Sequence, residues 1–296
     1  MGKIAAELEQ ALARRAVCGS PGALTGRLLA EGEGWSVEDV ICTSGPGDHP
    51  FEEQHDQVSI SIVVAGSFVY RSVAGRELMT PGSLMLGSPG QYFECGHEHG
   101  NGDRCLAFRY RADHFESLMA DTGGSGVRDS FRPLRLPPMR ELAPLVALAC
   151  AGVSGSAAVG WDELALRLAA EAIRLAGARR DRPKSAPAAA AARVTAAVRA
   201  IDRDPGGAHR VTALARDAGL SPYHFLRTFE QLTGVTPHRY VLRARLRQAA
   251  IRLRTDSDRV IEVAFSSGFG DVSNFNRAFR TEFGHSPRAY RKRVEI

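Results

Sequence analysis

The sequence predicts an α+β protein: a small N-terminal β-barrel with flanking helices, followed by an all-α region with two helix-turn-helix motifs. Three observations support this fold class. Residues 24–112 contain short runs of alternating apolar and polar side chains, separated by Gly/Pro turns. From about residue 139 the apolar residues recur at a helical period. The C-terminal part of the chain contains nearly the same pattern twice.

Length and composition are those of a globular protein with room for two cores. The chain has 296 residues, of which 44% are hydrophobic and 24% are charged. The charge is unevenly distributed, because residues 1–178 carry a net −7 and residues 179–296 a net +12. This asymmetry indicates that the C-terminal part meets a polyanion such as nucleic acid, although a solvated or membrane-facing basic surface would have the same charge.

Targeting signals and disulfides are not expected. No stretch approaches the ~18 consecutive apolar residues that span a bilayer. The first residues mix acidic and basic side chains at a helical period, unlike the apolar core of a signal peptide. The five cysteines are an odd number, and a chain of this length needs no disulfides. We therefore expect a cytoplasmic protein that does not contact a membrane.

The N-terminal region, residues 1–138, is expected to contain the barrel. Its strands are predicted in "QVSISIVVAGSFVYRSV" and "DRCLAFRYR", with turns around a short apolar run in "GRELMTPGSLMLGSPG". Residues 139–177 follow as a helical pair, and one helical face there carries Leu164, Leu168, Ala172 and Leu175. That face either covers the barrel or forms the seam of a dimer.

A linker separates these residues from the last region. Residues 178–189 begin with "ARRDRPKSAP", which combines two prolines with a charge cluster that cannot continue a helix. The last region comprises residues 190–296 and begins with an alanine-rich helix that stops before Pro205.

Two stretches of the last region repeat each other: "RDAGLSPYHFLRTFEQLTGVTPHRYVL" and "SSGFGDVSNFNRAFRTEFGHSPRAYRK". Six residues of the first stretch reappear fifty residues later: Phe225, Arg227, Phe229, Gly234, Pro237 and Tyr240. Upstream of them the matching residues, such as Gly219 and Gly268, are forty-nine apart. The turn of the second copy therefore contains one extra residue.

Each copy is typical of a helix, a turn and a second helix. Gly219 marks the first turn, and Ser221 and Asp271 are expected to cap the second helix of each copy. Gly234 and Gly284 stand where helices commonly end in a left-handed conformation. The second helices are expected to bury one stripe each: Phe225, Phe229 and Leu232 in the first copy, and Phe275, Phe279 and Phe283 in the second.

The segment between the copies, "PHRYVLRARLRQAAIRLR", predicts a helix with one apolar face and arginines over much of its remaining surface. About seventeen helical residues at ~1.5 Å rise span roughly 25 Å. A rigid connector of this size can hold two recognition helices about one DNA turn apart, ~34 Å between centres. The repeat would then give one chain two helices for successive major grooves.

Residues 190–293 resemble the AraC/XylS-type DNA-binding domain, most closely in "IEVAFSSGFGDVSNFNRAFRTEFGHSPRAYR". Through "TPGSLMLGSPG" and its strand pattern, the N-terminal region is similar to the cupin-like sensing domain that many such regulators carry. The resemblance implies a sequence-specific transcription regulator that binds double-stranded DNA as a homodimer, responds to a small-molecule effector and acts with RNA polymerase.

The same resemblance implies which side chains contact bases. Arg can bind guanine O6 and N7, and Asn can pair with adenine N6 and N7. Leucine and valine can contact only a thymine methyl group or exclude water. The alternative for each arginine is a phosphate contact or a surface ion pair. The residues at the matching positions are Tyr223, Leu226, Arg227, Val272, Ser273, Asn276 and Arg277.

The stretch "YFECGHEHGNGDRC" contains a candidate metal site in the N-terminal region. On a strand, Cys95, His97 and His99 share one face, and Cys105 could complete the set across a hairpin. Two thiolates and two imidazoles suit Zn²⁺ or another transition metal. The alternatives are a polar hairpin with ordinary cysteines and histidines, or a thiol switch between the two cysteines.

A metalloenzyme of the cupin type tethered to a DNA-binding region is the alternative function. Enzymatic cupins use a His-x-His pair followed by a glutamate and a further histidine, whereas here His97 and His99 are followed by Asp103. No phosphate-binding glycine loop or nucleophile–base set is present, so we expect no enzymatic activity. His49 and His55 lie in a polar loop, at the surface or beside a pocket.

Overall fold

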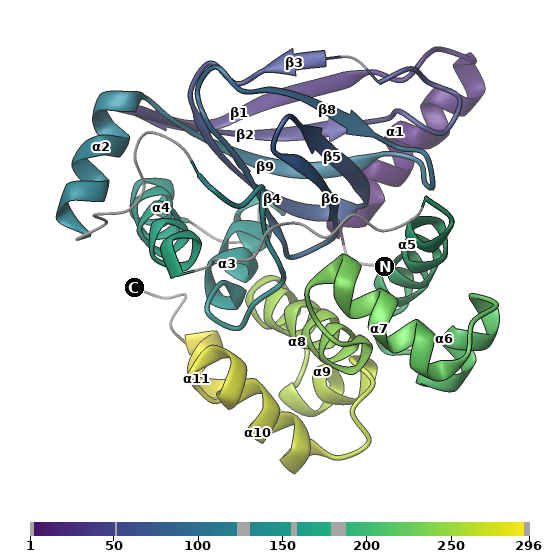
Figure 1. Cartoon of the computed structure of the whole chain (residues 1–296). Helices are drawn as coiled ribbons and strands as arrows, with labels where there is room; N and C mark the ends of the chain where they lie inside the picture. Colours follow the sequence, from purple (N-terminus) through teal and green to yellow (C-terminus); the bar gives the residue numbers. More distant parts are fainter. Residues whose placement is uncertain (1–2, 51, 123–130, 155–158, 179–187, 293–296) are drawn as a thin grey trace.

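The computed structural model of the chain describes residues 3–50, 52–122, 131–154, 159–178 and 188–292. In these residues ten strands and four helices form the N-terminal part, and seven helices form the C-terminal part (Figure 1). None of the helices in these ranges combines the length and the apolar character needed to cross a membrane.

The strands form two antiparallel sheets. The larger sheet contains, in spatial order, β1 (Leu24–Gly32), β2 (Trp35–Cys42), β9 (Asp103–Tyr110), β4 (Val58–Gly66), β7 (Leu84–Gly87) and β10 (Arg135–Leu136). The smaller sheet contains β3 (Glu52–Gln54), β8 (Tyr92–Gly96), β5 (Phe68–Ser72) and β6 (Gly75–Met79). In the described residues no strand of one sheet pairs with a strand of the other. The predicted barrel is therefore not closed, because closure requires a continuous ladder.

Successive side chains along the strands of the larger sheet point to opposite faces, one covered by helices and the other turned towards the smaller sheet. β9 lies between β2 and β4, with Cys42 opposite Asp103 and Ile62 opposite Leu106. Leu106 and Phe108 point to the face covered by helices and are fully buried. The alternate positions, which include Asp103, face the space between the two sheets.

Four helices accompany the sheets: α1 (Lys3–Cys18), α2 (Ala112–Asp121), α3 (Ala143–Val153) and α4 (Trp161–Ala178). The predicted stripe of α4 is buried in the core that α3 and α4 share with the larger sheet. At its centre the hydroxyl of Tyr110 donates a 2.8 Å hydrogen bond to the carbonyl of Ala165. The stripe therefore covers the larger sheet, which is one of the two roles predicted for it.

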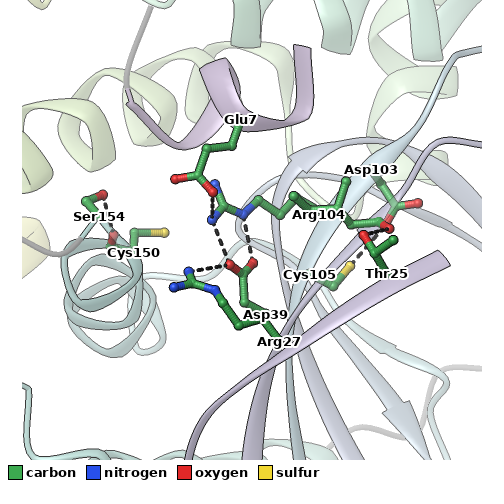
Figure 2. Close-up of polar contacts among 10 residues, drawn as sticks. Glu7, Thr25, Arg27, Asp39, Asp103, Arg104, Cys105, Cys150 and Ser154 are labelled. Carbon is green, nitrogen blue, oxygen red and sulfur yellow. Dashed lines mark hydrogen bonds and ion pairs between the residues drawn. The ribbon is translucent and has the colours of Figure 1, made fainter. Parts of the chain in front are cut away.

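A buried guanidinium joins α1 to the larger sheet (Figure 2). Arg104 is fully buried and donates from Nε and Nη2 to the two carboxylate oxygens of Asp39, both at 2.8 Å. Its Nη2 also contacts Glu7 of α1 at 2.7 Å, and Arg27 pairs with Asp39 at 3.0 Å. Burial alone would raise the pKa of Asp39, but the hydrogen bonds from Arg104 and Arg27 hold it below 3.8. The buried carboxylate of Asp39 is therefore ionised and paired with the buried Arg104 guanidinium.

The C-terminal part contains two helical cores. Its helices are α5 (Ala188–Arg203), α6 (Val211–Asp217), α7 (Pro222–Thr233), α8 (Pro237–Thr255), α9 (Val260–Ser266), α10 (Val272–Phe283) and α11 (Pro287–Lys292). The first core includes Val194, Val198, Ile201, Phe225, Phe229 and Tyr240. The second includes Leu253, Val263, Phe275, Phe279, Phe283 and Tyr290. The long helix α8 contributes to both cores and so joins them (Figure 1).

The predicted helix boundaries of both motifs are confirmed. Ser221 caps α7 by accepting from the amide of His224, and Asp271 caps α10 by accepting from the amides of Ser273 and Asn274. Gly234 and Gly284 end these helices at φ of 78° and 76°. The extra residue of the second turn lies between Gly268 and Asp271, where the first copy has only one residue between Gly219 and Ser221.

The sheets and the C-terminal helices are in direct contact. Ala147 of α3 packs in the second helical core beside Leu246 of α8. Arg135 donates to the carbonyl of Leu232, near the end of α7, at 2.9 Å. Arg243 of α8 contacts both the carbonyl of Pro138 and the carboxylate of Glu282 on α10. Each helix-turn-helix unit is therefore attached to the N-terminal part.

Candidate functional site

A cavity of about 590 Å³ lies between the two sheets. Its walls come mainly from β2, β4 and β9 on one side and β3 and β8 on the other. Arg109 of β9 pairs with Glu38 of the neighbouring strand β2 at 2.5 Å, and both line the cavity on the side of the larger sheet. Burial raises the pKa of Glu53, an effect that Arg109 partly offsets. A space of this size with a few charged groups can hold a small polar molecule.

His55 is buried at the wall of this cavity rather than exposed on a loop. Its ring stacks on Phe93 with centroids 4.1 Å apart, and Nε2 lies 2.8 Å from the hydroxyl of Tyr70. Burial, with a smaller contribution from Arg109, lowers the pKa of His55 to about 4. The ring is therefore neutral near pH 7.

Acidification is expected to destabilise the protein through His55. Because its pKa is lower in the folded chain than the ordinary 6.5, its contribution is complete above pH 6.5 and is lost as pH falls towards 4, by about 3 kcal/mol. His55→Gln is expected to flatten the dependence of the unfolding free energy on pH in that window, measured by urea unfolding from pH 7 to pH 4. His49→Gln serves as the control, and an unchanged slope in His55→Gln would contradict the assignment.

The predicted metal ligands are only partly brought together. The strand β8 ends at Gly96, so His97 and His99 lie in the following turn and do not share a strand face with Cys95. Cys95 and Cys105 line the cavity, and His99 is not in the cluster described below. The expected strand geometry is wrong because the glycines of "GHEHGNG" end the strand early.

A different group of residues forms a compact buried cluster. In the described part of the chain, Cys42, His97 and Asp103 are the one set whose potential ligand atoms all lie within 4.8 Å of one another. His97 Nε2 is 2.6 Å from Asp103 Oδ1, and the Cys105 thiol donates to Asp103 Oδ2 at 3.2 Å. Burial alone would lower the pKa of His97, but the hydrogen bond to Asp103, with a contribution from the nearby Cys42 thiol, raises it to about 9.

Sequence reasoning missed Cys42 and Asp103 as members of this cluster. Cys42 comes from β2, and it meets Asp103 because the two are paired in the register of β2 and β9. No local motif contains this pairing, since the two residues are far apart along the chain. Only a correct strand pairing could have identified it.

The two helices predicted to read DNA expose the predicted faces. On α7, Tyr223 is 64% and Leu226 37% exposed, and Arg227 extends from the same face with its guanidinium 5.8 Å from the Tyr223 ring centre. On α10, Ser273, Asn276 and Arg277 are exposed and Val272 is partly exposed. The opposite faces carry the buried phenylalanines. All seven predicted side chains are thus accessible, at least in part, to a ligand outside the protein.

An open depression of about 780 Å³ adjoins the exposed face of α10. Asn276, Arg277 and Arg280 line it from α10, and Arg288 lines it from α11. Three guanidinium groups around one depression favour an anionic partner such as the phosphate backbone of DNA.

Three arginines of α8 are not part of a free basic surface. Arg245 donates to the carbonyls of Pro205, Gly207 and Gly268 at 2.8–3.0 Å. Arg247 pairs with Asp202 at 3.1 Å, and Arg254 lies over the ring of Tyr290 at 4.8 Å. These contacts bind neighbouring segments of the C-terminal part together.

Comparisons with known proteins agree with this geometry. Residues 214–293 match the family model described as a helix-turn-helix domain. The HTH-type transcriptional regulator Rv1931c of Mycobacterium tuberculosis is 40% identical over 106 residues, which cover 32% of this chain and 41% of that protein. The HTH-type transcriptional activator RhaS of Escherichia fergusonii is 45% identical over 80 residues, which cover 27% of this chain and 29% of that protein.

Residues 214–293 therefore form a helix-turn-helix domain. Each match spans less than half of the relative's own length, so it describes the helix-turn-helix domain and not the relatives' remaining regions. Among solved structures, the DNA-binding domain of AdpA in complex with a target DNA is 32% identical, covering 34% of this chain and 90% of that chain, with a TM-score of 0.33. ToxT from Vibrio cholerae O395 is 12% identical, and the match covers 89% of this chain and 99% of that chain with a TM-score of 0.38.

Arg245 is expected to stabilise the relative position of the two motifs in the helix-turn-helix domain. Its three carbonyl acceptors belong to the loop before α6 and to the turn of the second motif. Arg245→Ala leaves these carbonyls without their charged donor and is expected to cost about 2–3 kcal/mol of stability. Urea unfolding measures this loss. Arg216→Ala, whose side chain is 79% exposed, is the control and should change little; equal stability of the two variants would contradict the role.

Proposed function

We propose that the protein is a sequence-specific DNA-binding transcription regulator. The observation that carries this proposal is the pair of matched helices, α7 and α10, which expose Arg227 and Arg277 at equivalent positions. Both helices are attached to α8, which contributes to both cores. A rigid connection of this kind suits two helices that enter successive major grooves. The net charge of +12 over residues 179–296 favours association with the duplex.

The second part of the proposal concerns control by an effector. The cavity between the sheets, with its charged and hydroxyl-bearing walls, is the candidate effector site. A bound effector can alter DNA binding only if it has different affinities for two states of the chain. Arg135 and Arg243 connect the end of the sheet region to α7 and α10, and these contacts are where two such states would differ.

The proposal includes a homodimer that acts on RNA polymerase at a promoter. The apolar stripe of α4 is buried within the chain, so a dimer would use other surfaces. The strand β1 is an edge of the larger sheet and exposes Leu24 and Leu28 to 48% and 52%. An exposed edge with apolar side chains favours pairing with a second chain. Sedimentation of the full chain and of Leu28→Lys measures whether this edge joins two copies.

Selection of bound sequences from a random DNA pool tests the proposed function. The full chain is expected to enrich one motif containing two short elements about one helical turn apart. Repeating the selection with Arg227→Ala and with Arg277→Ala should relax one element each. Binding without enrichment of any sequence would contradict the regulator and favour a general DNA-architectural role. An absence of DNA binding would contradict both.

A further inference from the structure

The buried cluster of Cys42, His97 and Asp103 has the composition and the position of a metal site. All three residues are at most 5% exposed. A thiol, an imidazole and a carboxylate are the donor types that Zn²⁺ and similar ions take from proteins. The cluster opens on the cavity between the sheets, which gives an ion a way in.

The fold brings the three donors together from separate elements. Cys42 ends β2 and Asp103 begins β9, and the two are direct partners in the antiparallel register. His97 begins the turn that joins β8 to β9, so the turn places the imidazole against Asp103. The set is thus fixed by the ladder between β2 and β9 and by one short turn.

Two further observations point to a ligand. The second ring nitrogen of His97, Nδ1, is buried and has no hydrogen-bond partner in the described residues. A buried polar atom without a partner is costly. A bound ion would allow the His97 ring to reorient so that Nδ1 gains a partner. A fourth donor is also available, since the Cys105 thiol contacts the other oxygen of Asp103 at 3.2 Å.

We propose that Cys42, His97 and Asp103 bind a divalent transition-metal ion of the zinc class, with Cys105 as the fourth ligand. For the three clustered residues binding needs only small movements, because zinc–ligand bonds of about 2.0–2.3 Å put neighbouring ligand atoms roughly 3.4 Å apart. Cys105 lies outside the 4.8 Å set and has to turn its side chain towards the ion. The thiols and the imidazole release their protons to solvent when the ion binds, and no oxidant or reductant takes part.

The turn that holds the site also contacts the DNA-binding region. Arg199 of α5 donates to the carbonyl of Asn101 at 2.7 Å, and its guanidinium packs on Gly100. The same helix buries Val194 and Val198 in the core beneath α7. An ion bound at the two ends of the turn, His97 and Asp103, would therefore affect the placement of α5. This regulatory step rests on the proposed function, whereas the metal site does not.

Titration of the chelator-treated full chain with Co²⁺ and Zn²⁺ tests the site directly. Co²⁺ is expected to bind one ion per chain with a thiolate charge-transfer band, and Zn²⁺ to displace it and raise the melting temperature. Metal binding should weaken more than about 100-fold in each of the variants Cys42→Ser, His97→Gln and Asp103→Asn. Changes to residues that only support a metal ligand typically weaken binding roughly 10–100-fold. His99→Gln and Cys18→Ser are the matched controls and should bind like the unaltered chain.

The outcomes separate the possibilities. The proposal is overturned if the chain binds no ion, if Cys42→Ser and Asp103→Asn keep full affinity, or if His99→Gln alone abolishes binding. Circular dichroism shows whether each variant folds. If one variant does not fold, the other two variants and the charge-transfer band still test the metal site.

The regulatory step is measured on a selected DNA with and without Zn²⁺. Zn²⁺ is expected to change DNA affinity at least about fivefold. The Arg199→Met variant should still bind Zn²⁺ and DNA, but its DNA affinity should no longer depend on Zn²⁺. Unchanged DNA affinity in a chain that holds Zn²⁺ overturns the regulatory step. A chain that holds Zn²⁺ but binds no DNA contradicts the proposed function and leaves the metal site supported.

Discussion

Arg104→Ala is expected to destabilise the folded chain by about 3–5 kcal/mol, the largest single effect we anticipate. The guanidinium is fully buried and satisfies both oxygens of Asp39 while also contacting Glu7. Its removal leaves the Asp39 carboxylate buried, with the largely exposed Arg27 as its remaining charged partner among the described residues. An uncompensated buried charge is far more costly than the loss of an exposed ion pair.

Urea unfolding at pH 7 measures this cost, and a double variant identifies its cause. Arg104→Met combined with Asp39→Leu removes both charges and is expected to recover most of the lost stability. Arg27→Ala, which removes a largely exposed partner, should cost no more than about 1 kcal/mol. If the double variant is as unstable as Arg104→Ala, packing rather than the orphaned charge is responsible.

Arg277→Ala is expected to weaken binding to the selected DNA by about 1–3 kcal/mol, or roughly 5- to 150-fold, and to relax one base position. Arg277 is exposed beside Asn276 on α10, opposite the buried Phe275 and Phe279. A guanidinium in this position can make two hydrogen bonds to guanine, which alanine cannot replace.

Titration of labelled duplexes that carry each base at the affected position measures the change. Arg280→Ala and Arg288→Ala, which lie in the same depression, are the matched comparison for phosphate contact. They are expected to weaken all duplexes alike and to reduce the salt dependence of binding. If Arg277→Ala also weakens every duplex equally, Arg277 contacts phosphate and not a base.

The helix-turn-helix units could be predicted almost residue by residue, because their signals are local. A cap such as Ser221 or Asp271 acts on amides two or three residues away. A phenylalanine stripe depends only on the helical period. The exposed faces of α7 and α10 follow directly from these stripes.

The N-terminal part was less predictable, because its features depend on contacts between distant strands. Strand existence followed from alternation, but the division into two sheets depends on which strands pair. The cluster of Cys42 with Asp103 has the same origin. The metal prediction at Cys95 and His99 used spacing alone and assumed a strand that continues through His99, whereas the strand ends at Gly96.

The arginines of α8 show a further limit of sequence reasoning. A run of alternating arginines and apolar residues indicates a solvated basic face. Arg243, Arg245 and Arg247 instead donate to carbonyls and carboxylates of neighbouring segments. A long cationic side chain can end in solvent or on a backbone carbonyl, and only the tertiary neighbours decide between these.

A footprint of the full chain on a selected duplex tests the central claim most directly, namely that α7 and α10 enter successive major grooves. Methylation interference is expected to reveal two major-groove segments on one face of the DNA, about one helical turn apart. Arg227→Ala should remove one segment and Arg277→Ala the other. A single segment, or two variants that affect the same bases, would contradict the account.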